Sequence, residues 1–250
     1  ILKRTMEILQ DISKVPGTKG VPVYITECDI DIGVRTSLYE NPVMVYRNTE
    51  YYAVFQCALI KELLDISREF PSNPIEGIMM DSFFFPGRRV FEGQRTILTA
   101  GDIEKPVFNA LRILGKLGTE RVEFNSSGKN NVDGIAARSG DTLQVMIYNY
   151  NPDINYRDTK MVDVTINLPA SKSYLLTHYR IDKDHSNSYS VWKSLGKPVV
   201  PDEEQMKVIK ARQGLETLES PRIINPKNNQ ITISFELPPL SVSLLSLIHI

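Results

Sequence analysis

An apolar run near the N-terminus, VPVYITECDI at residues 21–30, ends by presenting a glutamate, a cysteine and an aspartate. Residues 21–26 have the short, continuously apolar pattern typical of a parallel strand that is buried on both faces. Side chains at the carboxyl ends of such strands point into the crevice where ligands bind. A carboxylate held there, Glu27, can attack an anomeric carbon and form a glycosyl ester. From position alone, the alternative is a glutamate that pairs with a nearby arginine or caps the next helix.

The histidines have simpler interpretations. His185 lies close to Asp182 and Asp184, but one histidine and two acids on a turn are weak evidence for a metal. We expect a structural turn there, with Asp182 bonding to local backbone donors. His178 lies in an alternating strand and is expected to be a packed or surface residue. No metal site and no cofactor are implied, because carboxylate attack and proton transfer suffice for the chemistry of Glu27.

Bulk composition narrows the class of protein. The 250 residues include 42% hydrophobic residues, enough for one large domain or two modest ones. With 29 basic and 30 acidic residues the net charge is −1, so bulk electrostatics recruit neither nucleic acid nor an anionic membrane. No stretch reaches the roughly 18 to 20 apolar residues of a membrane span. The cysteines, Cys28 and Cys57, are too few for a disulfide scaffold, and Cys28 is expected to be a small packed hydrophobe.

The first half of the chain alternates helix and strand. A helical pattern opens the chain and precedes the strand at 21–26. A loop at 28–47 leads to a helix at 49–64 capped by Asn48 or Thr49, and then to a second buried strand at 77–85. Pro106 opens a helix that ends at Gly118. This order predicts a parallel sheet with crossover helices.

The second half changes to a period of two. Apolar residues alternate with polar ones around residues 143–147, 162–166, 231–235 and 242–244, which is typical of antiparallel strands with one apolar face. Asp202 and Gln205 form a capping-box pattern that predicts a helical insertion. We place the boundary between the halves near residues 118–121.

Both ends of the chain look cut. Ile1 stands inside a helical pattern with no capping residue before it. The last six residues, LSLIHI, are also the translation of a transposon-end adapter used in sequencing libraries. We expect residues 245–250 to be an adapter-derived artefact, and the alternative is an ordinary apolar strand end.

Four stretches together resemble glycoside hydrolase family 39. They are VYITE at the strand end, LTAGDIEKPVFNALRILGKLG from Leu98, VMIYNY from Val145 and HYRIDKDHSNSYSVWKSLGKP from His178. The resemblance spans nearly the whole chain in order, and RIDKDHSN is its most specific part. It implies a retaining β-xylosidase or α-L-iduronidase built from a (β/α)8 barrel followed by a β-sandwich. The expected fold class is therefore α/β plus all-β, with residues 1–119 as the C-terminal part of a TIM barrel and residues 120–244 as an antiparallel β-sandwich.

Carried over by position, Glu27 matches the family's nucleophile at the end of barrel strand 7. Residues 77–85 would be strand 8, and residues 106–117 the last barrel helix. The family's acid/base, a glutamate after an asparagine at the end of strand 4, lies in a region that this chain does not contain. Glu40 precedes Asn41 in the wrong order and is interpreted as a loop residue. We therefore expect this chain alone to be inactive, because it holds one carboxyl group of a pair.

The resemblance leaves the sugar undetermined. Cys28 stands where the family commonly has tryptophan, and the expected aromatic and acidic platform after strand 8 is replaced here by residues 81–85. Candidate substrate-binding residues are Asp29, Asp81, Phe84 and Arg88. A guanidinium recognises a carboxylate bidentately, so Arg88 or Arg89 would favour an α-L-iduronidase-like uronide hydrolase if either points into the crevice.

The residues and the resemblance leave three hypotheses. The first is a retaining exo-glycosidase acting on β-xylosides or related glycosides. The second is a non-catalytic carbohydrate-binding relative, and the third is a sandwich that serves as a structural or docking module. The expected partner is a carbohydrate substrate, with no nucleic acid and no membrane; a homo-oligomer is left open, and the sequence does not indicate a compartment.

Overall fold

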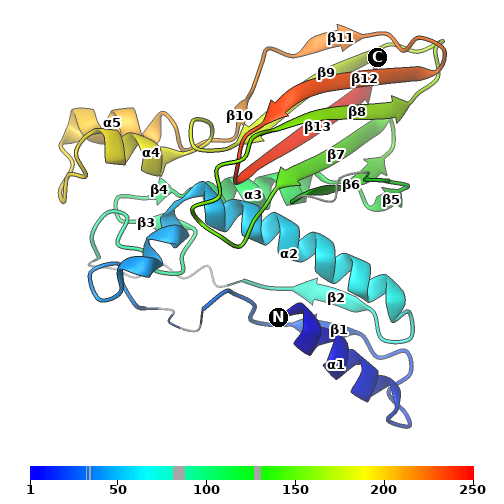
Figure 1. Ribbon diagram of the computed structural model, residues 1–250, viewed down its shortest axis with the longest axis horizontal. Helices are drawn as coiled ribbons and strands as arrows, with labels where there is room; N and C mark the ends of the chain where they lie inside the picture. Colours follow the sequence, from blue (N-terminus) through cyan, green and yellow to red (C-terminus); the bar gives the residue numbers. More distant parts are fainter. Residues whose placement is uncertain (32, 34, 81–87, 127–130) are drawn as a thin grey trace.

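The computed structural model describes residues 1–31, 33, 35–80, 88–126 and 131–250. Helices and short strands alternate in the first part of the chain (Figure 1). In chain order these elements are α1 (Leu2–Ser13), β1 (Val23–Ile25), η1 (Pro42–Asn48), α2 (Glu50–Glu69), β2 (Ile75–Ile78), β3 (Leu98–Thr99), β4 (Ile103–Glu104) and α3 (Pro106–Lys116).

The second part is built mainly from longer strands that pair antiparallel. Its elements are β5 (Glu120–Val122), β6 (Val132–Ser139), β7 (Thr142–Asn149), β8 (Lys160–Asn167), β9 (Tyr174–Ile181), α4 (Ser188–Ser194), α5 (Glu203–Lys210), β10 (Glu216–Thr217), β11 (Arg222–Ile224), β12 (Gln230–Leu237) and β13 (Ser241–His249). The change of period in the sequence is thus matched by a change from helix-rich to strand-rich structure.

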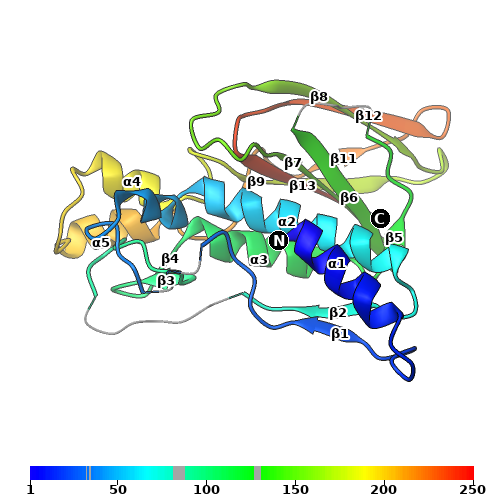
Figure 2. The same cartoon turned by 60° about the horizontal axis from the view of Figure 1, so that its bottom comes forward.

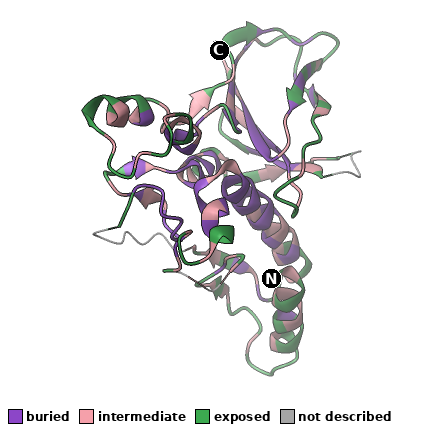
Figure 3. Ribbon diagram, turned by 60° about the vertical axis from the view of Figure 1, so that its left-hand side comes forward, coloured by how far each residue is buried: buried purple, intermediate pink, exposed green. Residues whose placement is uncertain are grey.

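Helix α2 is buried on two faces and joins the two parts. Its small residues, Ala53, Val54, Cys57 and Ala58, pack in one hydrophobic cluster with β6, β7, β13 and α3. Its larger residues, among them Tyr52, Phe55, Leu59 and Leu63, pack in another cluster with α1 and β2. Small side chains let a helix approach a sheet closely, whereas large ones fill the wider space on the other side. Figure 3 shows α2 largely in the colour of buried residues.

Strands β1 and β2 run parallel, with Ile25 opposite Ile78. Figures 1 and 2 both place this pair on one side of α2 and the large sheet on the other. The connection from β1 to β2 runs through α2, as expected for parallel strands, which need a crossover longer than a tight turn. The predicted parallel arrangement is therefore present in β1 and β2, whereas β3 and β4 form a separate antiparallel pair.

The large sheet has the strand order β10-β9-β13-β7-β6-β5, and β11 also pairs with β9. A separate antiparallel pair, β8 with β12, lies over one face of this sheet. Apolar residues from both layers form a common cluster that includes Val145, Ile147, Leu245, Ile233 and Phe235. One face of each layer is therefore apolar because it covers the other layer, which explains the period of two.

Several predicted elements are confirmed with shifted boundaries. Helix α2 begins after Thr49, but the Thr49 hydroxyl donates to the carbonyl of Tyr46 rather than capping the helix. The Asp202–Gln205 capping box is present at α5. Strand β2 overlaps only the start of the strand expected at 77–85, and residues 81–87 lie outside the described part.

Strand β6 carried no alternating signal in the sequence because its central residues are small. A Cβ atom at Gly134 would lie 2.2 Å from the carbonyl oxygen of Met146 on β7. The close approach of these two strands therefore requires glycine at this position.

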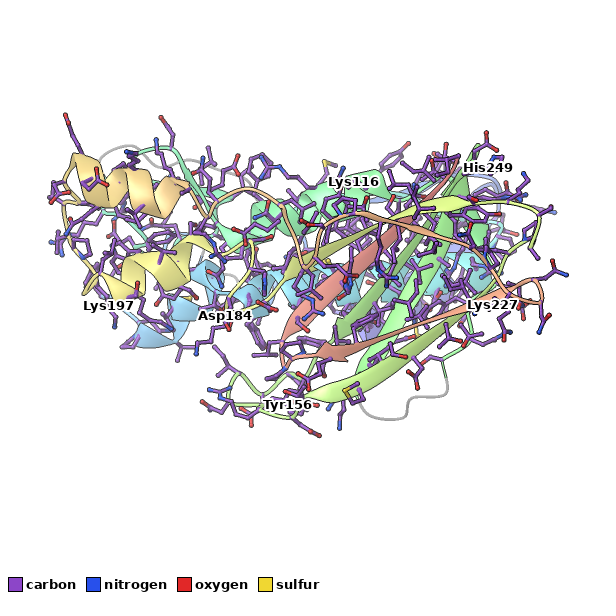
Figure 4. All side chains as sticks on the ribbon, turned by 90° about the horizontal axis from the view of Figure 1, so that it is seen from above. Lys116, Tyr156, Asp184, Lys197, Lys227 and His249 are labelled. Carbon is purple, nitrogen blue, oxygen red and sulfur yellow. The ribbon has the colours of Figure 1, made fainter. Side chains whose placement is uncertain are left out.

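The last residues of the chain complete β13. Leu245 and Leu247 are fully buried, and residues up to Ile248 pair with β7 while residues up to His249 pair with β9. Figure 4 shows His249 and Lys197 at opposite ends of the molecule. None of the helices in the described ranges combines the length and apolar character needed to cross a membrane.

Truncation of Leu244 to alanine is expected to destabilise the chain by about 3 kcal/mol, because it opens a cavity between β13 and helices α2 and α3. Chemical denaturation would measure the loss. The control is Met161→Ala, whose side chain on β8 is exposed and whose loss should cost no more than about 0.5 kcal/mol. Equal effects of the two substitutions would contradict the assignment of this cluster as the joint between the two parts.

Candidate functional site

Glu27 lies two residues beyond the end of β1. Because β1 and β2 are parallel, their carboxyl ends meet at one edge, where the backbone N–H of Met79 donates to the carbonyl of Ile25 at 2.8 Å. The Glu27 side chain is 60% exposed. A strand end therefore holds this carboxylate at a position that solvent, and a ligand, can reach.

Arg95 contacts Glu27 from the loop that precedes β3. Its Nη2 atom forms an ion pair with Oε1 of Glu27, and its Nε atom lies 3.3 Å from Oδ2 of Asp29. Its Nη1 atom donates to the backbone carbonyl of Asp31 at 3.0 Å. The guanidinium side chain is only 3% exposed. The buried guanidinium of Arg95 thus bridges Glu27 and Asp29.

Asp29 is buried behind Glu27, with its side chain 2% exposed. Tyr52 donates its hydroxyl to Oδ2 at 2.7 Å, and the backbone N–H of Ile30 donates to Oδ1 at 2.6 Å. Burial raises the pKa of Asp29, whereas the Tyr52 hydroxyl, the Ile30 amide and Arg95 act in the opposite direction. Tyr52 belongs to the first turn of α2, so this helix helps to fix the acid that holds Arg95.

A second buried arginine lies close to this group. Arg47, at the end of η1, is fully buried, donates from Nη1 to the carbonyl of Gly33 at 2.7 Å and from Nε to the Tyr46 hydroxyl at 3.0 Å. Burial raises the pKa of Tyr46 to about 12, so its hydroxyl is protonated at neutral pH. Arg47 and Arg95 thus place two buried guanidinium groups near the carboxyl group of Asp29.

The predicted site residues are only partly brought together. Glu27 and Asp29 share Arg95 as a partner. Arg88 instead lies 3.4 Å from Oε1 of Glu92, and the Arg89 guanidinium lies over the ring of Tyr39. Asp81 and Phe84 fall outside the described residues. The substrate contacts predicted for Asp29, Asp81, Phe84 and Arg88 therefore stay predictions.

The other reactive side chains have structural surroundings. Cys28 is buried, and burial raises the pKa of its thiol. His178 lies 2.9 Å from the Ser243 hydroxyl, and burial with the nearby Arg180 lowers the pKa of its imidazole to about 3. The carboxylate of Asp182 accepts from the backbone N–H groups of Asp184 and His185, as a turn requires. Among the described residues, no cluster of His, Cys, Asp and Glu is arranged to hold a metal ion.

Sequence reasoning missed Arg95 and Tyr52. Arg95 is 68 residues from Glu27 and stands alone in a loop, whereas the adjacent Arg88 and Arg89 were predicted as the arginines of the site. Tyr52 has the spacing of a core residue in α2 and is one, but its hydroxyl also reaches Asp29. The local sequence around Arg95, QRTILT, is mostly polar and carries no signal of its burial.

A cavity of about 990 Å³ lies elsewhere, between the large sheet and β8. Its walls are the aliphatic faces of both layers, including Val145, Ile147, Val162 and Val164, with polar residues at the rim. Neither Glu27 nor Arg95 lines it. This cavity is the open side of the packing between the layers and not the site at the end of β1.

Comparisons with known proteins cover nearly the whole chain. The sequence profile of the family described as "Glycosyl hydrolases family 39" matches residues 2–229. A β-xylosidase from Caldicellulosiruptor saccharolyticus is 30% identical over 226 residues, which are 89% of this chain and 43% of that protein. This chain thus spans less than half the length of that relative.

Solved structures with low identity share the fold. A bacterial orthologue of human α-L-iduronidase matches with a TM-score of 0.80 at 17% identity, over 98% of this chain and 45% of its own. A GH39 enzyme from Xanthomonas axonopodis pv. citri has a TM-score of 0.78 at 15% identity, over 100% and 48%. A monomeric β-xylosidase from Caulobacter crescentus CB15 has a TM-score of 0.74 at 18% identity, over 99% and 48%. At these identities the likeness concerns the fold alone.

Replacing Tyr52 with phenylalanine is expected to destabilise the protein more at pH 7 than at pH 4. The pKa of Asp29 in the folded state lies above its unfolded value. At pH values above the folded pKa, ionising the buried Asp29 therefore lowers the stability of the protein. This cost disappears as the pH falls through the folded pKa toward the unfolded value. Loss of the Tyr52 hydroxyl raises that pKa further and removes a hydrogen bond to a charged group, worth about 1.5–3 kcal/mol. Urea denaturation at the two pH values would measure the difference.

Tyr51→Phe is the matched control for this prediction. The Tyr51 hydroxyl donates to the neutral carbonyl of Pro152 at 3.0 Å, so its loss should cost about 1 kcal/mol at both pH values. A pH-independent cost for Tyr52→Phe would show that Asp29 is not ionised in contact with Tyr52.

Proposed function

The chain belongs to glycosyl hydrolase family 39, and we propose that it supplies the nucleophile of a retaining glycosidase that removes β-xylosyl or related residues. The observation that carries this proposal is the geometry at the end of β1. Glu27 is exposed to solvent, and the buried guanidinium of Arg95 holds its carboxylate. An anionic, anchored and accessible carboxylate is what the first displacement at an anomeric carbon requires.

In the proposed reaction, Glu27 attacks the anomeric carbon and forms a covalent glycosyl-enzyme as the leaving-group oxygen departs with a proton from a second carboxyl group. Water, activated by that second group, then attacks the same carbon and releases Glu27. Arg95 holds one oxygen of Glu27 and so leaves the other free to approach the sugar. Each turnover returns the carboxylate to its starting charge.

We propose that the second carboxyl group comes from outside this chain. A retaining pair stands about 5 to 5.5 Å apart with both groups open to the substrate. Asp29 does not meet this need, because its side chain is buried and bound to Tyr52, Ile30 and Arg95. Glu40 accepts a hydrogen bond from the backbone N–H of Ser37 at 2.8 Å and belongs to a loop turn. The chain alone is therefore expected to lack turnover.

The same reasoning supports a proposal for the domains. Two parallel strands joined through α2 cannot close a barrel, which needs about eight. We propose that residues 1–119 form the last part of a (β/α)8 barrel and that residues 120–244 form a β-sandwich beside it. The share of about half that this chain covers in its relatives accords with this division.

Incubation of the full-length protein with a 2-fluoro-xyloside that bears a good leaving group should label Glu27, because fluorine slows the second displacement and the covalent intermediate accumulates. Peptide mass spectrometry would locate the label. Glu27→Gln should abolish labelling and lower kcat/KM by at least about four orders of magnitude, as removal of a nucleophile does elsewhere.

Glu40→Gln is the matched control and should leave both labelling and turnover unchanged, since Glu40 bonds within its own loop. A label on any other residue, or full activity in Glu27→Gln, would refute the assignment. Turnover by residues 1–250 alone would refute the proposal that the acid/base comes from outside.

One observation favours a second candidate, a uronide hydrolase resembling α-L-iduronidases. Arg95 provides a guanidinium beside the proposed nucleophile, in the role that sequence reasoning had given to Arg88 or Arg89. A uronic acid presents a carboxylate to such a group, whereas a xyloside presents hydroxyls. In this alternative, the buried Arg95 side chain would turn part of its guanidinium from the Asp31 carbonyl toward the substrate while it holds Glu27.

Substrate preference separates the two candidates. With aryl β-xyloside and aryl α-L-iduronide as substrates, Arg95→Gln should lower kcat/KM about equally on both if Arg95 only holds Glu27. If Arg95 also binds the uronate, the loss on the iduronide should be at least about tenfold greater. Arg138→Gln, which removes an exposed partner of Glu120, is the control that should change neither.

A further inference from the structure

Lys105 occupies a position that local rules disfavour. It is the N-cap residue of α3, where its side chain makes no capping hydrogen bond. Helix N-termini favour short polar side chains and negative charge, and they disfavour cations. The Lys105 side chain is also buried, with the residue 1% exposed, and no carboxylate of the described residues forms an ion pair with it. A residue that breaks several local rules at once is expected to serve a constraint elsewhere.

The contacts of Lys105 identify that constraint. Its Nζ atom donates to the carbonyl of Gln94 at 2.8 Å, and its backbone N–H donates to the carbonyl of Ile97 at 3.0 Å. The same Gln94 carbonyl also accepts from the backbone N–H of Thr96 at 2.9 Å. Lys105 therefore holds the loop on both sides of Arg95, the residue whose side chain bridges Glu27 and Asp29.

We propose that Lys105 is a positioning residue for the nucleophile, acting by fixing the backbone of residues 94–97 so that Arg95 reaches Glu27. This inference rests on the proposed function, in which Glu27 attacks the sugar. The chain of contacts runs from the start of α3 through the Gln94 carbonyl to the Arg95 guanidinium and then to the Glu27 carboxylate. Loss of the amine leaves a buried carbonyl with one donor fewer and a loop free to shift, and small displacements of a reacting group cost large factors in rate.

The electrostatic surroundings agree with this role. Burial, and after it the charge of Arg47, lower the pKa of Lys105 to about 7, while Asp29 acts in the opposite direction. Both the neutral amine and the ammonium carry N–H groups, so the hydrogen bond to Gln94 persists in either state. The charged groups that act on the amine are Arg47 from η1 and Asp29 from the loop after β1.

The test is Lys105→Met in the full-length protein, a change that keeps side-chain length and the backbone hydrogen bond to Ile97 but removes the donor to Gln94. The rate constant for inactivation by the 2-fluoro-xyloside should fall about tenfold or more. The loss should lie in the maximal rate of inactivation and leave the half-saturating concentration of the inhibitor unchanged, because Lys105 acts on the position of the reacting carboxylate and not on the binding of the sugar. Hydrogen–deuterium exchange should become faster in the peptide that spans residues 94–98.

Lys116→Met is the matched control. Lys116 lies at the other end of α3, where its amine lies over the Tyr179 ring, and Figure 4 labels it. This variant should change neither exchange nor inactivation. If Lys105→Met does not fold, Lys105→Gln, which is too short to reach Gln94, is expected to show the same losses.

The outcomes are distinguishable. Unchanged exchange at residues 94–98 would overturn the proposal. A lower melting temperature or faster exchange with an unchanged inactivation rate would overturn it as well, since Lys105 would then be only structural. If the unsubstituted protein is not labelled at Glu27, the proposed function fails instead, and exchange still decides whether Lys105 holds the loop of Arg95.

Discussion

The guanidinium of Arg95 cannot be buried without partners, and this constraint organises the end of β1. A buried cation needs an opposing charge and hydrogen bonds to offset its desolvation, and removal of one partner typically costs about 3–5 kcal/mol. Asp29 supplies a buried partner, Asp31 supplies a carbonyl, and Glu27 supplies an exposed one. The exposed carboxylate of Glu27 is thus held by Arg95, whose own position is fixed by its buried contacts with Asp29 and Asp31. Accessibility and fixed position, which usually oppose each other, are combined in Glu27.

Helix α2 transmits this constraint to the rest of the molecule. Its face of small residues contacts the large sheet, and its opposite face supplies Tyr52, which donates to Asp29. A change in how α2 sits on the sheet would therefore move the Tyr52 hydroxyl, whose hydrogen bond lowers the pKa of Asp29 against the effect of burial. The strand-rich part contributes to the site in this indirect way, through the position that it gives to the helix.

Periodicity and capping signals predicted α2, α3, α5 and the antiparallel strands because these elements depend on local composition. They also placed Glu27 at a strand end, since an apolar run followed by an acid is a local pattern. The residues that surround these acids could not be predicted, because they are distant in the sequence: Arg95 and Tyr52 contact Asp29 from 66 and 23 residues away. Strand β6 escaped detection for the opposite reason, since Gly134 reflects contact with β7 and not a strand preference. The motif KPVFNALR marks a helix start through Pro106 but gives no sign that Lys105 is buried.

The charges around Glu27 bear on the choice between the two proposed substrate classes. Arg47 and Arg95 are buried cations, the buried amine of Lys105 has a pKa of about 7, and Asp29 has a buried carboxyl group near them. Glu27 pairs with one of these cations, Arg95. A neutral xyloside adds no charge beside Glu27, the proposed nucleophile. A uronate would add a second negative charge that competes with Glu27 for the same cations. An enzyme that prefers uronides must therefore hold more positive charge than the nucleophile alone needs. Replacing a single cation should therefore affect the two substrates unequally only in a uronide hydrolase.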